Sequence, residues 1–291
     1  MDSVNILGVN ISTATVPQLI EQVDHWVDMR QPRTIMYANA HCLNLAWEQP
    51  GYRAVLNQAS LVCADGTGVV LGARLLGRKR PHKASGTEWF SRFCRLADRR
   101  RLRIYILAGA PGVAEEAARR IQRQWPGIQI CGTSDGYFRS RPEGDVLEEL
   151  RQTAPDVLFV GRGSPLQEFW VHQHRRDLPA TLCWTVGSLF DLISGVERWP
   201  PPVFGRLGLQ WLWRLIVNPT GKWRRYLVGN PRFIFRLLSH RQIDDPRATA
   251  EPPSKSEEGG PSFSAAGETI NYPSVDRMVA EDRLEIDQHA P

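Results

Sequence analysis

One carboxylate in this sequence lies where an enzyme would use it. Asp65 directly follows the apolar segment 61–64 and precedes Gly66-Thr67-Gly68, a turn that lets backbone approach a ligand closely. A carboxylate in this position can take a proton from a bound hydroxyl group as a general base. Aspartate is also a favoured N-cap residue, so it can instead cap a helix that starts at Gly68. The position of Asp65 alone leaves both roles open.

Small polar residues and glycines follow other apolar segments in the same way. Asn39 and His41 come after segment 34–38, where the asparagine can bind a substrate hydroxyl or cap a helix. Other segments end in Gly109-Ala110-Pro111-Gly112, Gly161-Arg162-Gly163 and Gly187-Ser188, and the second of these turns lacks the third glycine of the dinucleotide fingerprint. No HExxH, DxD or GxxxxGK(S/T) motif occurs, so the motifs indicate neither a metal centre nor a P-loop.

The segments that would position these residues alternate between two patterns. Short apolar, β-branched runs predict strands at 34–38, 60–64, 103–108, 128–131, 157–160 and 181–186. Helical patterns occur at 15–29, 42–48, 51–57, 68–76, 87–100, 113–125, 166–176 and 189–194. This alternation predicts an α/β fold with a mostly parallel sheet and helices on both faces. Ligands bind such sheets beyond the carboxyl ends of the strands, so the residues above are expected at one edge.

Residues 198–238 differ in composition from the rest of the chain. They contain four of the ten tryptophans and no acid. Their eight basic residues are Arg198, Arg206, Arg214, Lys222, Arg224, Arg225, Arg232 and Arg236. Aromatic side chains interleaved with arginine suit a membrane interface, which carries both phosphate charge and an apolar layer. The sequence therefore predicts membrane docking by this stretch.

Three regions follow from these patterns: an α/β domain (1–195), a helical appendage (196–240) and an acidic tail (241–291). The Trp199-Pro200-Pro201-Pro202 run predicts an extended break after the α/β domain. In the appendage we expect one helix with a polar stripe of Arg206, Gln210 and Arg214, followed by short helices at 222–228 and 232–239 separated by Gly229-Asn230-Pro231. The tail is rich in Pro, Ser, Gly and acids, which predicts disorder.

Composition limits where the protein works. The formal charge of +5 divides into −6 for the tail and +11 for the preceding 240 residues, which favours a local docking surface over general affinity for polyanions. The five cysteines form no CxxC pair, as is typical of reduced cytoplasmic proteins. No signal peptide pattern and no apolar run of about 20 residues occurs. These features predict a cytoplasmic protein bound peripherally to the inner face of the cell membrane.

The motifs at the predicted strand ends, taken in order, resemble the WecG/TagA/CpsF glycosyltransferases (glycosyltransferase family 26). The matching blocks are Asn39-Ala40-His41, Ala64-Asp65-Gly66-Thr67-Gly68-Val69-Val70, Gly109-Ala110-Pro111-Gly112-Val113, Asp135-Gly136-Tyr137-Phe138, Gly161-Arg162-Gly163-Ser164-Pro165-Leu166-Gln167-Glu168, Val186-Gly187-Ser188-Leu189-Phe190-Asp191, and two blocks at 206–215 and 223–233. They span roughly residues 5–238, and the acidic tail lies outside the resemblance.

The resemblance implies a Rossmann-like domain and an inverting sugar transfer that needs neither a metal ion nor a cofactor. The implied donor is a UDP-sugar, carrying an N-acetylmannosamine-type sugar or a hexose. The implied acceptor is a saccharide on a polyprenyl diphosphate at the cytoplasmic membrane surface. Such products feed bacterial cell-surface polysaccharides such as teichoic acid and exopolysaccharide. No nucleic-acid partner is expected, because the predicted appendage helices carry too many large apolar residues, and the oligomeric state is open.

Residue roles carry over by matching position. Asp65 resembles the catalytic base, and Asn39 and Gln167 resemble donor-sugar contacts. Gly109, Gly136 and Gly187 would line the nucleotide pocket, with Asp191 beside them. Since no metal is implied, cations must stabilise the departing diphosphate. The basic residues expected to do so are Arg214, Lys222, Arg224 and Arg225.

This chain departs from the family pattern beside the sugar. Tyr37 stands where many members have threonine, and Lys83 occupies a common arginine position, which removes a bidentate contact. N-acetylmannosamine is therefore not assumed as the donor sugar. Two other classes of protein stay open: a nucleotide-binding oxidoreductase, disfavoured by the incomplete glycine fingerprint, and a non-catalytic membrane-surface adaptor, which would leave Asp65 and Asn39 without a role.

Overall fold

A six-stranded parallel sheet forms the centre of the molecule, and the strand order is β4-β3-β8-β7-β5-β6. The computed structural model describes residues 1–84 and 87–241. The strands are β3 (Arg33–Ala38), β4 (Leu61–Ala64), β5 (Arg103–Ala108), β6 (Gln129–Ser134), β7 (Val157–Gly161) and β8 (Leu182–Thr185). All six lie at or within about three residues of the segments predicted from apolar β-branched runs, because strands buried on both faces are apolar throughout.

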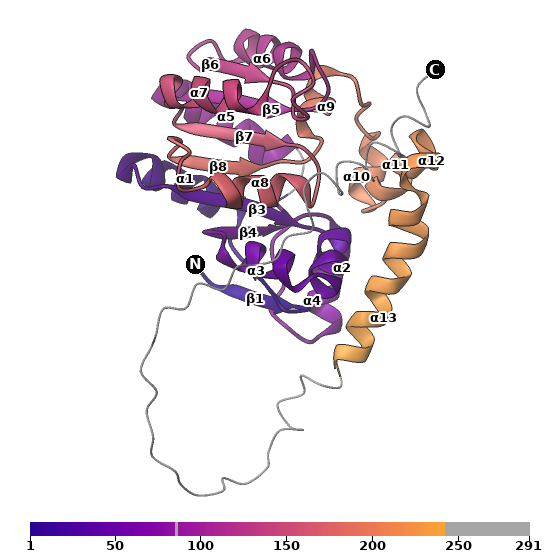
Figure 1. Cartoon of the computed structure of the whole chain (residues 1–291). Coiled ribbons are helices and arrows are strands. Elements are labelled where there is room, and N and C mark those ends of the chain that lie inside the picture. Colours follow the sequence, from indigo (N-terminus) through magenta and orange to yellow (C-terminus); the bar gives the residue numbers. More distant parts are fainter. Residues whose placement is uncertain (85–86, 242–291) are drawn as a thin grey trace, which may run out of the picture. The chain divides into compact units, whose positions relative to one another are not determined.

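Helices cover both faces of the sheet (Figure 1). One face packs against α1 (Val16–Met29), α5 (Thr87–Arg100), α6 (Val113–Gln124) and α9 (Leu189–Ser194). The other packs against α2 (Ala40–Glu48), α3 (Pro50–Gln58), α4 (Thr67–Leu75), α7 (Glu143–Thr153) and α8 (Leu166–His174), together with a hairpin of β1 (Ser3–Ile6) and β2 (Val9–Ser12). The predicted α/β class is thus confirmed.

Two elements were missing from the sequence prediction. Helix α7 buries only Val146 and Leu150 among many charges, so its apolar stripe is too narrow to stand out. The β1–β2 hairpin has four-residue strands, and its apolar side chains enter the core beside α3 and α4 only through tertiary packing.

The appendage is a chain of short helices at the carboxyl ends of the strands (Figure 1). It comprises α10 (Pro202–Arg206), α11 (Gln210–Val217), α12 (Pro219–Trp223), a π-helical turn η1 (Arg224–Val228) and α13 (Gly229–Arg241). The single helix expected to carry Arg206, Gln210 and Arg214 is wrong, because the chain turns at Gly208, where φ is +72°, so Arg206 ends α10 and only Gln210 and Arg214 lie on α11. The break expected at Gly229-Asn230-Pro231 is wrong, because α13 begins at Gly229 and places Pro231 in its first turn. A helix tolerates proline there, since the first N–H groups have no intrahelical acceptor.

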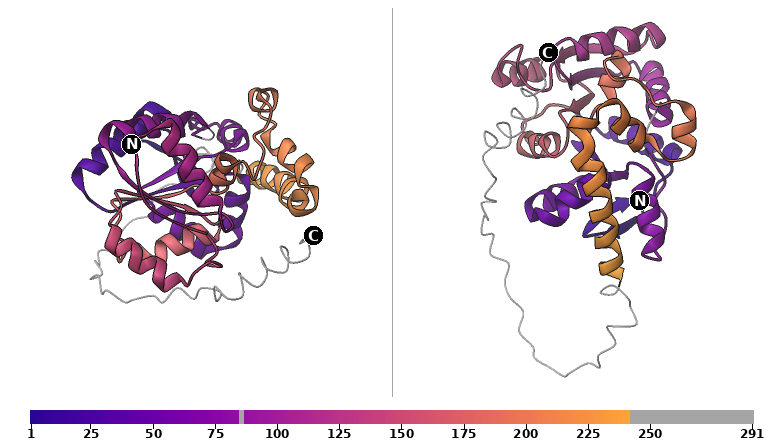
Figure 2. Two further views of the ribbon diagram at one scale, coloured as in Figure 1. Left: turned by 90° about the horizontal axis from the view of Figure 1, so that it is seen from above. Right: turned by 90° about the vertical axis from the view of Figure 1, so that its right-hand side faces the viewer.

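The appendage also contributes to the core. Residues Met1–Leu237 form one compact unit, and Phe233 and Leu237 of α13 are 3% and 1% exposed in the same apolar cluster as α2 and α4. Figure 2 shows α13 running alongside the α/β domain. No helix within the described residues is long and apolar enough to cross a membrane. The predicted disordered tail lies outside the described residues except for Arg241, and the domain boundaries at 195 and 240 stay predictions.

Candidate active site

Two neighbouring strands, β3 and β4, bring Asp65 and Asn39 together. Asp65 directly follows β4, and its backbone N–H donates to the carbonyl of Ala38, the last residue of β3. Its carboxylate Oδ2 accepts a hydrogen bond of 3.4 Å from Nδ2 of Asn39. The side chains meet because the ends of adjacent parallel strands share one edge of the sheet.

The structure shows which of these two residues caps a helix. Helix α4 is capped by Gly66, whose φ is +85°, and no side chain caps this helix, so the Asp65 carboxylate is not used as a cap. Asn39 does cap α2, since its Oδ1 accepts from the N–H groups of His41 and Cys42 at 3.0 and 3.1 Å. Its Nδ2 still reaches Asp65. Capping therefore fixes the amide in an orientation that directs its donor toward the carboxylate.

Two cations approach Asp65 from different parts of the chain. Lys83 follows a short bridge to Ala64, and its Nζ donates to Oε1 of Gln210 at 2.9 Å. Burial lowers the pKa of Lys83, and the nearby Asp65 charge partly opposes this. Arg214 lies one helical turn beyond Gln210. Burial lowers its pKa, but Tyr226, Glu197 and Asp65 outweigh that effect, so the net shift is upward and the guanidinium stays charged.

The glycine turns at the strand ends are held against one another. The N–H of Gly109 donates to the carbonyl of Gly161, and that of Gly136 donates to the carbonyl of Gly109, at 3.0 and 2.8 Å. A Cβ on Gly136 would lie 2.9 Å from the Gly161 carbonyl oxygen, and one on Gly161 would lie 2.7 Å from that of Gly187. These glycines thus permit close backbone packing at the strand ends, and their role in lining a nucleotide pocket stays a prediction.

Gln167 is buried and its carboxamide is engaged by the protein. Its Oε1 accepts the N–H of Gly187 at 3.0 Å, while Nε2 donates to Oε1 of Glu168 at 2.7 Å and to Oγ of Ser164 at 3.4 Å. One lone pair of Oε1 is left for a ligand. Gln167 therefore holds the Gly187 turn in addition to any sugar contact.

Tyr37 extends from β3 toward the α5 side of the sheet. Its ring lies 5.8 Å from that of Trp89, and its hydroxyl is buried without a well-oriented hydrogen-bond partner among the described residues. Burial raises the pKa of this phenol well above its ordinary value, so Tyr37 is neutral. Tyr37 lies two residues before Asn39, and its neutral hydroxyl is buried beside Trp184, so a contact between Tyr37 and the sugar stays a prediction.

A second charged group lies beside Gly109. A Cβ on Gly109 would be 3.1 Å from Oδ1 of Asp191. Burial raises the pKa of Asp191, with Glu197 adding to the rise and Lys222 and Arg214 opposing it. Lys222 itself pairs with Glu197 at 2.9 Å, and both side chains are mostly buried. Arg214 is the residue that links this group to Asp65.

Arg224 and Arg225 differ in position. Arg225 is half-buried and lies close enough to His41 to affect its titration: burial, followed by Arg225, lowers the pKa of His41 to about 3. His41 is therefore neutral at physiological pH. Arg224 is exposed and stacks on the exposed Trp223, 5.4 Å from the ring centre. No contact that the structure gives for the described residues joins Arg224 to the group around Asp65.

The sequence analysis did not identify Glu168 as a functional residue. Its side chain is fully buried, and burial raises its pKa to about 7 although hydrogen bonds from Gln167 and Ser164 act in the opposite direction. Helical periodicity could have identified Glu168. The buried face of α8 carries positions 167, 168, 170 and 171, and two of these four residues are polar. Within the described residues, no cluster of three or more His, Cys, Asp or Glu side chains is arranged to hold a metal ion.

Comparison with known proteins points to one glycosyltransferase family. The model of the WecG/TagA/CpsF glycosyl transferase family matches residues 4–245. A relative from Bacillus spizizenii is 34% identical over 227 residues, covering 78% of this chain and 85% of the relative. Relatives from Staphylococcus aureus (28%) and Bacillus subtilis (29%) each cover 82% of this chain, and 93% and 91% of their own length. All three are named N-acetylglucosaminyldiphosphoundecaprenol N-acetyl-β-D-mannosaminyltransferase.

Proposed function

The chain belongs to the WecG/TagA/CpsF family of glycosyl transferases, and we propose that it transfers a sugar from a UDP-sugar to a saccharide on a polyprenyl diphosphate. The names of the relatives support a donor of the N-acetylmannosamine type and an undecaprenyl-diphosphate acceptor bearing N-acetylglucosamine. A UDP-hexose is the alternative donor, because Tyr37 and Lys83 depart from the family pattern near the sugar. The product would enter a cell-surface polysaccharide.

The observation that carries this proposal is the Asp65 carboxylate, which is not used as a cap and faces Asn39, Lys83 and Arg214. In the proposed reaction the acceptor hydroxyl attacks the anomeric carbon from the side opposite the UDP group. Asp65 takes the hydroxyl proton, a carbon–oxygen bond to the acceptor forms, and the bond to the diphosphate oxygen breaks with inversion. Lys83 and Arg214 each lie near enough to Asp65 for its charge to influence their own titration, so both cations are close to the proposed base.

The departing diphosphate requires positive charge that is in place before the reaction. In the proposed mechanism this charge comes from Arg214, Lys222 and Arg225, which approach the strand ends from the appendage. Asp191 and Glu197 hold two of these side chains through ion pairing and charge. Arg224 is exposed, so we assign it to the membrane surface instead.

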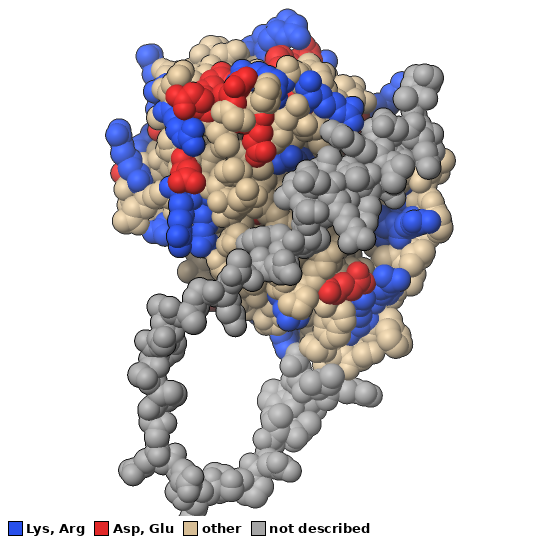
Figure 3. All heavy atoms as spheres, in the orientation of Figure 1, with Lys and Arg blue, Asp and Glu red and all other residues tan. Residues whose placement is uncertain are grey.

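Membrane docking of the appendage is supported by its exposed apolar side chains. These are Trp199, Val203, Leu207, Ile216, Val217, Trp223, Leu227, Val228, Ile234 and Phe235, each at least 41% exposed. The face drawn in Figure 3 shows acidic side chains gathered near α7, whereas the visible part of the appendage side shows mainly basic and uncharged side chains with an acidic group beside them. An apolar surface edged with arginine suits the interface of an anionic leaflet, and we assign the protein to the inner face of the cell membrane.

The variant Asp65→Asn tests this function. We expect it to bind UDP as the wild type does and to lose transfer by roughly 100-fold or more, since a general base contributes about 10²–10⁴-fold. Product mass is read after incubation with a panel of UDP-sugars and a synthetic lipid-linked acceptor. Asp98→Asn, on the far end of α5, is the matched control. Unchanged transfer in Asp65→Asn would overturn the assignment of the base, and no transfer by the wild type would favour the adaptor.

A further inference from the structure

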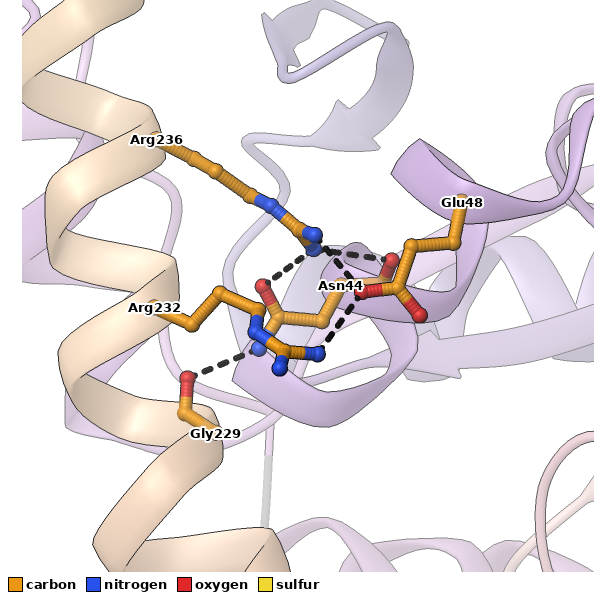
Figure 4. Close-up of polar contacts among 5 residues, drawn as sticks. All are labelled: Asn44, Glu48, Gly229, Arg232 and Arg236. Carbon is orange, nitrogen blue, oxygen red and sulfur yellow. Dashed lines mark hydrogen bonds and ion pairs between the residues drawn. The ribbon is translucent and has the colours of Figure 1, made fainter.

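Helix α13 is fastened to α2 by a set of polar contacts (Figure 4). Asn44 Nδ2 donates to the carbonyl of Gly229, the first residue of α13, at 2.8 Å. Arg236 Nη1 donates to Oδ1 of Asn44 at 2.9 Å and to its carbonyl at 3.1 Å. Arg236 and Arg232 both pair with Oε1 of Glu48, at 2.6 and 3.1 Å. We call Asn44, Glu48, Arg232 and Arg236 the α2–α13 latch.

The latch is a specific contact because the buried Asn44 amide is bonded at both its oxygen and its nitrogen. Asn44 is 7% exposed, and both ends of its amide are used, so an aliphatic side chain could not replace it without leaving buried polar groups unpaired. The hydrogen bond from Arg236 is the largest influence lowering the pKa of Glu48, with Arg232 contributing further. Glu48 therefore stays ionised between two arginines that would otherwise repel each other.

The same turns of α13 that carry Arg232 and Arg236 also make an apolar contact with α4. Gly72 of α4 faces Phe233 and Leu237, and a Cβ at this position would lie 3.0 Å from Cδ1 of Leu237 and 3.2 Å from Cζ of Phe233. Glycine at position 72 thus permits the close approach of α13. Because this contact involves no charge, it can be disturbed independently of the latch.

The two ends of α2 connect the latch to the site. Its first turn carries Asn39 and His41, and its last turn carries Glu48. Arg225 lies next to His41, four residues before the Gly229 carbonyl that Asn44 anchors. The residues between them form the π-helical turn η1, which continues into α13 without interruption. Because Asn44 holds Gly229 in place, it also holds Arg225 in place relative to the first turn of α2.

We propose that Asn44 and Glu48 are positioning residues for sugar transfer, and that they hold the start of α13 so that Arg225 is presented to the donor diphosphate. This inference rests on the proposed function, because it assumes that appendage cations assist departure of the UDP group. The α2–α13 latch is remote from the reacting atoms, and it would set the position of Arg225 among them. Loss of the latch should lower kcat and leave the fold of the nucleotide-binding domain unchanged.

Charge reversal in the latch tests the proposal. Glu48→Arg places three arginines together and should release α13, lowering kcat for transfer by roughly 10- to 100-fold, the range expected when a charge-stabilising group is displaced. UDP affinity should stay within about twofold, since the strand ends are predicted to line the nucleotide pocket. The double variant Glu48→Arg with Arg232→Glu again places a carboxylate between two arginines, leaves the Arg236 bonds to Asn44 in place and should recover most of the lost turnover. Glu148→Arg, on exposed α7 where Glu148 also pairs with an arginine, should resemble the wild type.

Two measurements separate positioning from misfolding. Trypsin cleavage within α13 should accelerate in Glu48→Arg and return to the wild-type rate in the double variant, while the thermal transition stays cooperative. Gly72→Leu, which pushes α13 away without altering charge, should show the same loss of kcat. Undiminished kcat in Glu48→Arg, or a double variant no better than the single one, would overturn the role of the latch. Failure of the wild type to transfer sugar would instead overturn the proposed function, and the cleavage rates would still report docking.

Discussion

At the scale of single residues, the site is built from side chains that serve structure and chemistry together. Asn39 caps α2 with its oxygen and directs its amide donor to Asp65. Gln167 accepts a hydrogen bond from the N–H of Gly187 and donates one to the carboxylate of Glu168. The Asp65 carboxylate, by contrast, does not cap α4 and accepts a long hydrogen bond of 3.4 Å from Asn39. A carboxylate with no cap to satisfy, facing two cations, is available for proton transfer.

Glu168 gives a prediction about pH and stability. Its pKa is about 7 in the folded chain against an ordinary value of 4.5. Between these pH values the folded chain holds a proton that the unfolded chain has lost. The free energy of unfolding should therefore fall as pH rises from about 4.5 to 7, by an amount on the order of 3 kcal/mol.

The variant Glu168→Gln lacks this titration. Urea unfolding at pH 5, 6, 7 and 8 should show the wild type losing stability relative to the variant as pH increases. Parallel stability curves for the two proteins would contradict the raised pKa. Glu148→Gln on the surface of α7, whose side chain is 57% exposed, is the control and should follow the wild type.

At the scale of elements, α11 carries the appendage chemistry. Of the polar stripe predicted at Arg206, Gln210 and Arg214, two residues lie on α11: Gln210 accepts a hydrogen bond from Lys83, and Arg214 lies near Asp65. The exposed side carries Ile216 and Val217. Helical periodicity predicted the stripe because side chains four residues apart share a face.

Arg214 supplies the prediction at this scale. Arg214→Gln removes a cation that is shared between Asp65 and the Asp191 group, and should lower kcat by roughly 100-fold, as loss of one preorganised charge does. Steady-state transfer at saturating donor measures this. Arg151→Gln, an exposed arginine of α7, should leave kcat unchanged. A rise in KM with unchanged kcat would show that Arg214 binds substrate without favouring the transition state.

At the scale of the whole molecule, the appendage carries exposed apolar side chains, among them Trp223, Ile234 and Phe235. We expect binding to anionic vesicles to weaken only partly in about 1 M salt, since charge attraction is then screened within about 3 Å while apolar insertion persists. Sedimentation with vesicles of phosphatidylglycerol and phosphatidylcholine measures this. A variant with Ile234→Ser and Phe235→Ser should be released completely by salt. Complete release of the wild type would show that charge alone holds it.

The sequence by itself determined the α/β alternation, the strand ends that carry Asp65 and Asn39, and the basic, tryptophan-rich composition of the appendage. Each of these depends on neighbours within a few residues, such as an apolar run followed by a turn or a helical period. The sequence was less informative where local signals were weak or conflicting, as in α7 and at Gly229-Asn230-Pro231, where a proline in the first helical turn looked like a break.

Only the tertiary structure decided which of these residues meet. The strand order places β3 beside β4, so Asn39 reaches Asp65. Burial of α8 gives Glu168 its raised pKa. Asn44 and Arg236, which are 192 positions apart, join only when α13 folds back on α2. The physical reason is that propensity and periodicity are properties of short segments, whereas contact, burial and charge pairing depend on the packing of segments that are distant along the chain.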